Sequence, residues 1–228
     1  MAVDLMGRRA ALLAEFGDYA IPPGFRPADF LQTQNYQSII DTGVPGDDPT
    51  VAIDITIKSL GIQSYTHVLG NWKSEYARCL RLIQGTTTAP KNYVFTANTR
   101  RAGSSTALSV PNVTTIVGVK THVHLEYGTC KIAYAGTTFT STPTGDDTVE
   151  ISDKNIAIGR SSVDQTSVDA SRPPICYYDC QIRRQGRIIR SYTPLIRISD
   201  GKPGYYDRVN HTFSVSVGAS DFLAGYDE

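Results

Sequence analysis

The chain is predicted to be all-β, a two-sheet antiparallel sandwich with a short N-terminal helical segment. Some ten segments show the apolar and polar alternation, or the β-branched composition, of strands. Turn-forming Gly, Pro, Asp, Ser and Thr residues separate these segments. The 228 residues are 40% hydrophobic and 19% charged, which suffices for the core of one large domain. We therefore expect two packed sheets in a single unit.

The N-terminal residues differ from the rest. Residues 3–16 are predicted to form a helix with a rough apolar stripe, ended by Gly17 and by the Pro22-Pro23-Gly24 run. A helix of this length is marginal alone and needs a surface to pack on, in another chain or on its own sandwich. We expect residues 1–20 to be an attachment segment and residues 21–228 to be the sandwich domain. The candidate attachment residues are Leu5, Arg8, Arg9, Leu12, Leu13 and Phe16.

The strands follow in order along the sandwich domain. The predicted strands are residues 51–57, 66–70, 76–83, 92–97, 117–127, 130–134, 148–151, 156–158, 175–182, 187–198 and 211–217. Residues 137–148 and 159–173 are polar and are predicted to be exposed loops. Strict alternation in three strands predicts that these side chains share the core face: Ile53, Ile55, Val119, Val123, Leu125, Tyr178, Cys180 and Ile182.

The last quarter of the chain is the most informative part. Two strand-like segments flank a polar break at Arg183-Arg-Gln-Gly186, which predicts a hairpin. The turn sequence Ser199-Asp-Gly-Lys-Pro-Gly204 and the aromatic-rich sequence Tyr206-Asp-Arg-Val-Asn210 follow, and we expect a pair of turns there. A second block near the start contains Ile21-Pro-Pro-Gly-Phe25, an Ile40-Asp-Thr-Gly43 corner and the alternating segment 51–57.

These two ordered blocks resemble the concanavalin-A-like (laminin-G-like) jelly-roll domains of bacteriophage tail, fibre and other virion proteins. Between them the blocks bracket residues 21–223; the middle of the chain matches in pattern only. The resemblance implies a virion structural protein of a tail, tail fibre or head fibre that displays a lectin-like domain for host-surface glycans. Other virion proteins are the implied partners, together with further copies of the chain in a homo-oligomer.

Bulk charge narrows the range of partners. The formal net charge is zero and no basic stripe is present, which argues against nucleic acid and against an anionic membrane as partners. No apolar run approaches the ~18 residues that a membrane span needs. We find no export signal, so synthesis in the bacterial host cytoplasm, followed by a place in the virion, is expected. The cluster Arg183, Arg184, Arg187 and Arg190 is predicted to be the solvated face of the hairpin.

Two groups of residues bear on catalysis or metal binding. His122, His124 and Glu126 alternate with apolar residues and should point away from the core, where two imidazoles could bind zinc or simply cover the outer face. Glu150 and Asp153 are the nearest approach to the paired acids of glycosidases, but they fall on opposite faces. No nucleophile signature or phosphate loop is present. We expect no enzyme activity, no metal and no cofactor.

Binding residues are harder to place. Trp72, the only tryptophan, lies in a polar turn, where it could stack on a sugar ring or cover a sandwich edge or subunit contact. Tyr177, Tyr205, Tyr206 and Tyr226 are expected near surfaces. The turn acids Asp47-Asp48 and Asp146-Asp147 could bind calcium or merely favour turns.

The cysteines give no disulfide signal. Cys176 and Cys180 lie ~13 Å apart along one strand, too far for a disulfide, so free thiols are expected.

Two alternatives to a lectin-like virion protein remain open. The chain could be a purely structural decoration or assembly protein without a ligand. It could also be a secreted bacterial lectin or glycosidase.

Overall fold

The computed structural model describes a defined part of the chain. The described residues are 20–46, 48, 50–61, 66–71, 78–84, 93–101, 104–110, 117–126, 131–134, 137–140, 154–160, 164 and 173–227. Over these ranges the chain is all-β and contains no helix. The predicted helix at residues 3–16 and the predicted strand at 148–151 lie outside them.

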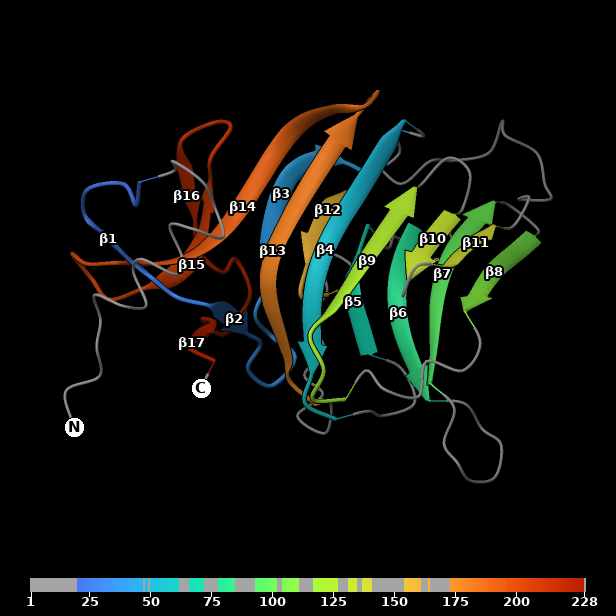
Figure 1. The fold of residues 1–228 in the computed structure, drawn as a ribbon, viewed down its shortest axis with the longest axis horizontal. Helices are drawn as coiled ribbons and strands as arrows, with labels where there is room; N and C mark the ends of the chain where they lie inside the picture. Colours follow the sequence, from blue (N-terminus) through green and yellow to red (C-terminus); the bar gives the residue numbers. More distant parts are fainter. Residues whose placement is uncertain are drawn as a thin grey trace.

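The elements are short to medium-length strands (Figure 1). They are β1 (Phe25–Pro27), β2 (Phe30–Gln32), β3 (Ile40–Pro45), β4 (Val51–Ser59), β5 (Thr66–Gly70), β6 (Arg78–Gln84), β7 (Tyr93–Arg101), β8 (Ser104–Val110), β9 (Thr121–Glu126), β10 (Lys131–Tyr134), β11 (Thr137–Thr140), β12 (Asn155–Ile158), β13 (Ile175–Arg184), β14 (Arg187–Arg197), β15 (Pro203–Asp207), β16 (Thr212–Ser214) and β17 (Leu223–Gly225).

The strands form two antiparallel sheets. The larger sheet has the order β11-β10-β9-β4-β13-β14-β15-β16, with β1 beside β14 and with β2 between β13 and β17. The smaller sheet has the order β3-β12-β5-β6-β7-β8. Figure 1 shows β13, β4 and β9 in front of the smaller sheet. The predicted two-layer antiparallel arrangement is therefore present.

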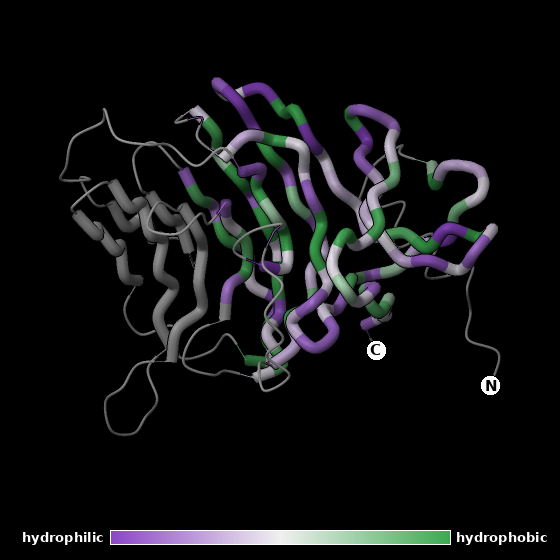
Figure 2. The backbone as a smooth tube through the Cα atoms, turned by 180° about the vertical axis from the view of Figure 1, so that it is seen from behind, coloured by the Kyte–Doolittle hydropathy of each residue, from purple (hydrophilic) through white to green (hydrophobic). Residues whose placement is uncertain are grey.

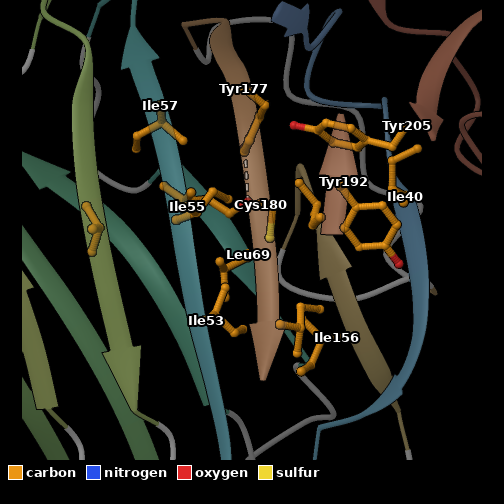
Figure 3. Packing of buried hydrophobic residues seen from close by; sticks show 14 of the residues in the cluster. Ile40, Ile53, Ile55, Ile57, Leu69, Ile156, Tyr177, Cys180, Tyr192 and Tyr205 are labelled. Carbon is orange, nitrogen blue, oxygen red and sulfur yellow. Dashed lines mark hydrogen bonds between the residues drawn. The ribbon is translucent and has the colours of Figure 1, made fainter. Parts of the chain in front are cut away.

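Alternating side chains of both sheets meet in one core (Figure 3). Ile53, Ile55 and Cys180 come from the larger sheet, and Leu69 and Ile156 come from the smaller one; all five are fully buried. Burial of one such aliphatic side chain stabilises the fold by about 1.5–3 kcal/mol. Apolar and polar residues follow one another along the strands of the larger sheet (Figure 2).

The core prediction is confirmed at six of its eight positions, and the predicted burial of Val119 is wrong. Its side chain is 47% exposed, because β9 begins only at Thr121. Gly118 has a φ of 75°, which breaks the extended backbone before the strand. The alternation in the sequence therefore starts at Val117 and Val119, before the strand itself begins. Gly118, between the two valines, marks the break.

Tyr178 is buried as expected, but on the opposite face of the sheet. A β-bulge between Tyr177 and Asp179 inserts one extra residue into β13, which shifts the alternation from odd to even positions. Tyr177 consequently takes the core position and donates its hydroxyl to the Val68 carbonyl at 2.9 Å. Tyr178 instead lies against Phe30 on the outer side.

Several strand boundaries also differ from the sequence prediction. Residues 137–140 were expected in a loop but form β11, while 203–207 were expected as a turn but form β15. Of the predicted strand 211–217, only Thr212–Ser214 is extended in a sheet. The predicted hairpin is confirmed: Gln185 and Gly186, with φ of 49° and 77°, form a two-residue turn between β13 and β14.

Candidate functional site

Many of the residues singled out from the sequence lie outside the described part of the chain. These are Trp72, all six candidate attachment residues of the N-terminal segment, and the acids Asp47, Asp146, Asp147, Glu150 and Asp153. Their predicted roles stay predictions.

The expectation of surface tyrosines is wrong for two of the four. Tyr177 and Tyr205 are fully buried and belong to the core cluster, whereas Tyr206 is half-buried and Tyr226 is 43% exposed. The β-bulge turns Tyr177 inward, and the alternation of β15 does the same for Tyr205. Cys176 and Cys180 are free and buried, as predicted. Desolvation raises the pKa of the Cys176 thiol to about 11, so it is unreactive near neutral pH.

The arginine cluster of the hairpin is more closely bound than a solvated face would be. Arg183 pairs with Asp54, Arg184 with Asp48, and Arg190 with Asp207. Of the four arginines, only Arg187 is classed as exposed. The side chains of Arg183 and Arg184 are still 36% and 40% exposed, so this face is partly solvated and is also paired with acids of neighbouring strands and turns.

Asp48 and Asp207 are turn residues with structural partners. The Asp48 carboxylate accepts hydrogen bonds from the Thr50 amide and hydroxyl at 2.8 and 2.6 Å. Asp207, 1% exposed, accepts from the amides of Ser191 and Val209 and from the Asn210 side chain. The Tyr206-Asp-Arg-Val-Asn210 motif is thus a turn held by the buried Asp207 carboxylate, which ties β15 to β14.

The outer face of the larger sheet contains an open hollow of about 570 Å³. It crosses β9, β4, β13 and β14, mostly at the positions that alternate with the core residues. Its lining residues are almost all polar. They are Asp54, Thr56, His122, Asp179, Gln181, Arg183, Ser191, Tyr192, Thr193 and Arg208.

A charged network begins at Asp54 on the wall of the hollow and extends along the outer face to His124 and Glu126. His124 donates from Nδ1 to Asp54 Oδ1 at 2.8 Å, and its Nε2 lies 3.3 Å from Glu126 Oε1. A protonated imidazole donates at both nitrogens, so a carboxylate oxygen beside each nitrogen favours the protonated form. The hydrogen bond to Asp54 accordingly raises the pKa of His124, and the same bond lowers the pKa of Asp54.

His122 lies at the rim of the same wall. Its Nε2 is 3.5 Å from Asp54 Oδ1, and its Nδ1 is 3.4 Å from the Thr56 hydroxyl. That hydroxyl donates to Asp179 Oδ1 at 2.9 Å, so the cross-strand contacts continue from β9 through β4 to β13. The predicted outward orientation of His122, His124 and Glu126 is confirmed. Within the described ranges no group of three or more ligating side chains could hold a metal ion.

The floor of the hollow carries hydrogen-bond donors. Arg183 donates from Nε to Asp54 Oδ2 at 3.2 Å and from Nη2 to Gln181 Oε1 at 2.9 Å. Because the Gln181 oxygen accepts from Arg183, its amide nitrogen remains as a donor. Ser191 and Thr193 add two hydroxyls, and Arg208 donates to the Thr193 hydroxyl oxygen at 2.8 Å.

An aromatic group adjoins the hollow on the same face. Tyr206 of β15 is the direct cross-strand partner of Thr193 on β14. The Phe25 ring lies 5.6 Å from the Tyr206 ring and 4.8 Å from the Phe213 ring, centroid to centroid. The outer face therefore places a half-buried aromatic cluster beside a polar hollow.

The comparisons with known proteins give no family. No protein-family model matches the chain, and no curated protein is significantly similar to it in sequence. In the described ranges there is no helix with the length and apolarity of a membrane span.

The sequence singled out His122 as an outward-facing residue, but it did not predict that His122 and the other lining residues form one site. The alternation around Asp54 and Thr56 did indicate outward polar side chains. Their joining with Arg183 and Ser191 depends on strand order and on the register across β4, β13 and β14. Nothing in the local pattern of one strand specifies either.

Proposed function

We propose that this chain is a bacteriophage virion protein whose concanavalin-A-like jelly-roll domain binds a host-surface glycan in the outer hollow. Support for the fold family comes from the two antiparallel sheets and from the two ordered sequence blocks at residues 21–57 and 175–210. In this proposal the hollow contacts the sugar, while residues 1–20 attach the domain to the particle or to sibling subunits.

One observation carries the binding proposal: a polar hollow with outward donors lies next to an aromatic cluster. The Gln181 amide and the Ser191 hydroxyl can hydrogen-bond the hydroxyl groups of a sugar. The Tyr206 ring offers an apolar surface to the C–H face of a sugar, and ordering its few torsions costs little entropy. The open form of the hollow suits a chain that passes across it rather than a small enclosed molecule.

A binding experiment on purified protein tests this proposal. The protein is applied to an array of capsular and cell-wall polysaccharides, and its binding is compared with that of Ser191→Trp, which fills the hollow. Arg187→Ala is the matched control, because Arg187 is exposed on the same hairpin and does not line the hollow. We expect the tryptophan variant to lose binding and the control to retain it. Absence of binding by the unaltered protein, or equal binding by Ser191→Trp, would reject the site.

The alternative of a purely structural decoration protein is favoured by a different observation. Leu60, Val117 and Val119 are 45%, 40% and 47% exposed, and the bridge between Ser59 and Val117 places them at the same end of β4. Such an apolar group would be covered in an assembled particle. Mass spectrometry of purified particles, followed by whole-particle imaging, distinguishes the two roles. The hollow should face solvent if it binds a host glycan and should be covered by a neighbouring subunit if it does not.

A further inference from the structure

We propose that the glycan bound in the outer hollow is anionic, carrying carboxylate or phosphate groups along its chain. This inference rests on the proposed function and adds the chemical class of the ligand. It follows from counting which hydrogen-bonding groups of the hollow are already used within the protein.

Two acids line the hollow, and the carboxylates of both already have partners. Asp179 Oδ1 accepts from the Thr56 hydroxyl at 2.9 Å. Asp54 Oδ1 accepts from His124 at 2.8 Å and faces His122 at 3.5 Å, and Oδ2 accepts from Arg183 at 3.2 Å. Its side chain is 22% exposed. A sugar hydroxyl that donated to Asp54 would have to displace one of these cationic partners, so the carboxylate is not a ready acceptor for a ligand.

The donors of the hollow are used only in part. Arg183 has five N–H donors and no acceptor. Only its Nε and one terminal nitrogen have partners within the described residues, which leaves Nη1 without one. Gln181 gives its oxygen to Arg183, so its Nε2 group also remains for a ligand. The Ser191 hydroxyl likewise has no partner in the described part of the chain, and it lies on the same floor.

This imbalance favours a ligand with more acceptors than donors. A neutral sugar hydroxyl donates as well as accepts, so it needs a hydrogen-bond acceptor on the protein. The floor of the hollow has few acceptors that are not already used. A carboxylate or phosphate oxygen only accepts, so it matches Arg183, Gln181 and Ser191 together. The guanidinium also binds such planar or tetrahedral oxyanions through paired N–H groups, and charge assistance strengthens each of these bonds.

Four polymers separate charge from sugar identity. Polygalacturonate is the carboxylate probe, and its fully methyl-esterified form has the same sugar backbone without charge. A glycerol phosphate teichoic acid is the phosphate probe, and poly-L-glutamate is a polyanion without sugar. We expect at least one acidic glycan to bind at least about tenfold more tightly than the neutral ester, and poly-L-glutamate to bind no better than the ester.

A charge-matched pair of variants assigns the effect to the hollow. Arg183→Gln and Arg187→Gln remove the same charge from the same hairpin, but only Arg183 lines the hollow. We expect Arg183→Gln to weaken the acidic glycan at least about tenfold and Arg187→Gln to change it less than twofold. Arg183→Lys keeps the charge without the fork of donors and should restore part of the affinity. A melting curve for each variant checks that it is folded.

Several outcomes would overturn the inference. Equal binding of the methyl ester, equal binding of poly-L-glutamate, equal effects of the two glutamine variants, or binding of neutral array glycans alone would each show that the hollow does not select an anionic sugar. Binding of neutral array glycans alone leaves the proposed glycan-binding function intact. Failure of every glycan on the array instead rejects the proposed function itself.

Discussion

Alternate residues of β4 and β9 form the inner and outer faces of the same two strands, yet the two faces are stabilised in different ways. Ile53 and Val123 face inward and lose all contact with water. Asp54 and His124 face outward and depend on each other and on Arg183 of β13. The inner face therefore tolerates any apolar side chain of similar volume, whereas the outer network requires particular partners at a particular register.

The largest expected effect is on the inner face. Val123→Asp places a charge at a fully buried position of the core cluster, directly across from Ile55 of β4. The expected cost exceeds about 4 kcal/mol, enough to abolish soluble expression. Soluble yield and a melting curve measure it, with His122→Ser as the neighbouring control. A soluble, folded Val123→Asp protein would show that the register of β9 is wrong.

Asp207 combines features of the two faces, because its side chain is polar but as buried as the core. Asp207→Ala leaves the amides of Ser191 and Val209 without their acceptor. We expect a loss of about 2–4 kcal/mol in the free energy of unfolding, measured by denaturant titration.

The control for Asp207→Ala is Asp200→Ala. That exposed carboxylate pairs with Arg197 at 2.6 Å, which also lowers the pKa of Asp200 to about 2. Surface pairs of this kind contribute little, so a much smaller loss than that of Asp207→Ala is expected. Similar losses in the free energy of unfolding for both variants would mean that the hydrogen bonds of Asp207 do not stabilise the fold more than a surface ion pair does.

The sequence could predict the inner face far better than the outer one. Period-two alternation alone identified Ile53, Ile55 and Leu125, because burial depends on the side chain and its strand. It failed at Val119 and Tyr178, where a glycine and a β-bulge interrupt the strand period. The hollow could not be predicted, since contact of Asp54 with Arg183 requires β4 and β13 to be neighbours although they lie far apart in sequence.

The outer network should make stability depend on pH. Because the pKa of His124 is raised, this histidine contributes fully to the free energy of unfolding below the ordinary histidine pKa. The contribution is lost as the pH rises through the raised value. The lowered pKa of Asp54 means that its contribution is present above the ordinary carboxyl pKa and is lost as the pH falls through the lowered value. The network therefore stabilises most between about pH 4 and about pH 6.5.

A comparison of melting temperatures at pH 5.5 and pH 8.5 measures this dependence. We expect the melting temperature to fall by about 2 °C more in the unaltered protein than in His124→Gln, since an exposed or half-buried pair contributes under about 1 kcal/mol. Glutamine keeps the size and one donor but does not titrate. Identical pH profiles for the two proteins would show that Asp54 and Glu126 do not stabilise the protonated form of His124.

The smallest expected effect is at His122, two residues from His124 on the same face. Its side chain is 58% exposed, and its contacts with Asp54 and Thr56 are long, 3.5 and 3.4 Å. The sequence predicted an outward position for both histidines and did not distinguish them. The structure does, because His124 is half-buried between two carboxylates. His122→Ser should change the free energy of unfolding by less than about 0.5 kcal/mol, measured by denaturant titration. A loss equal to that of His124→Ser would mean that both histidines hold Asp54 equally, and that the network is wider than its short contacts indicate.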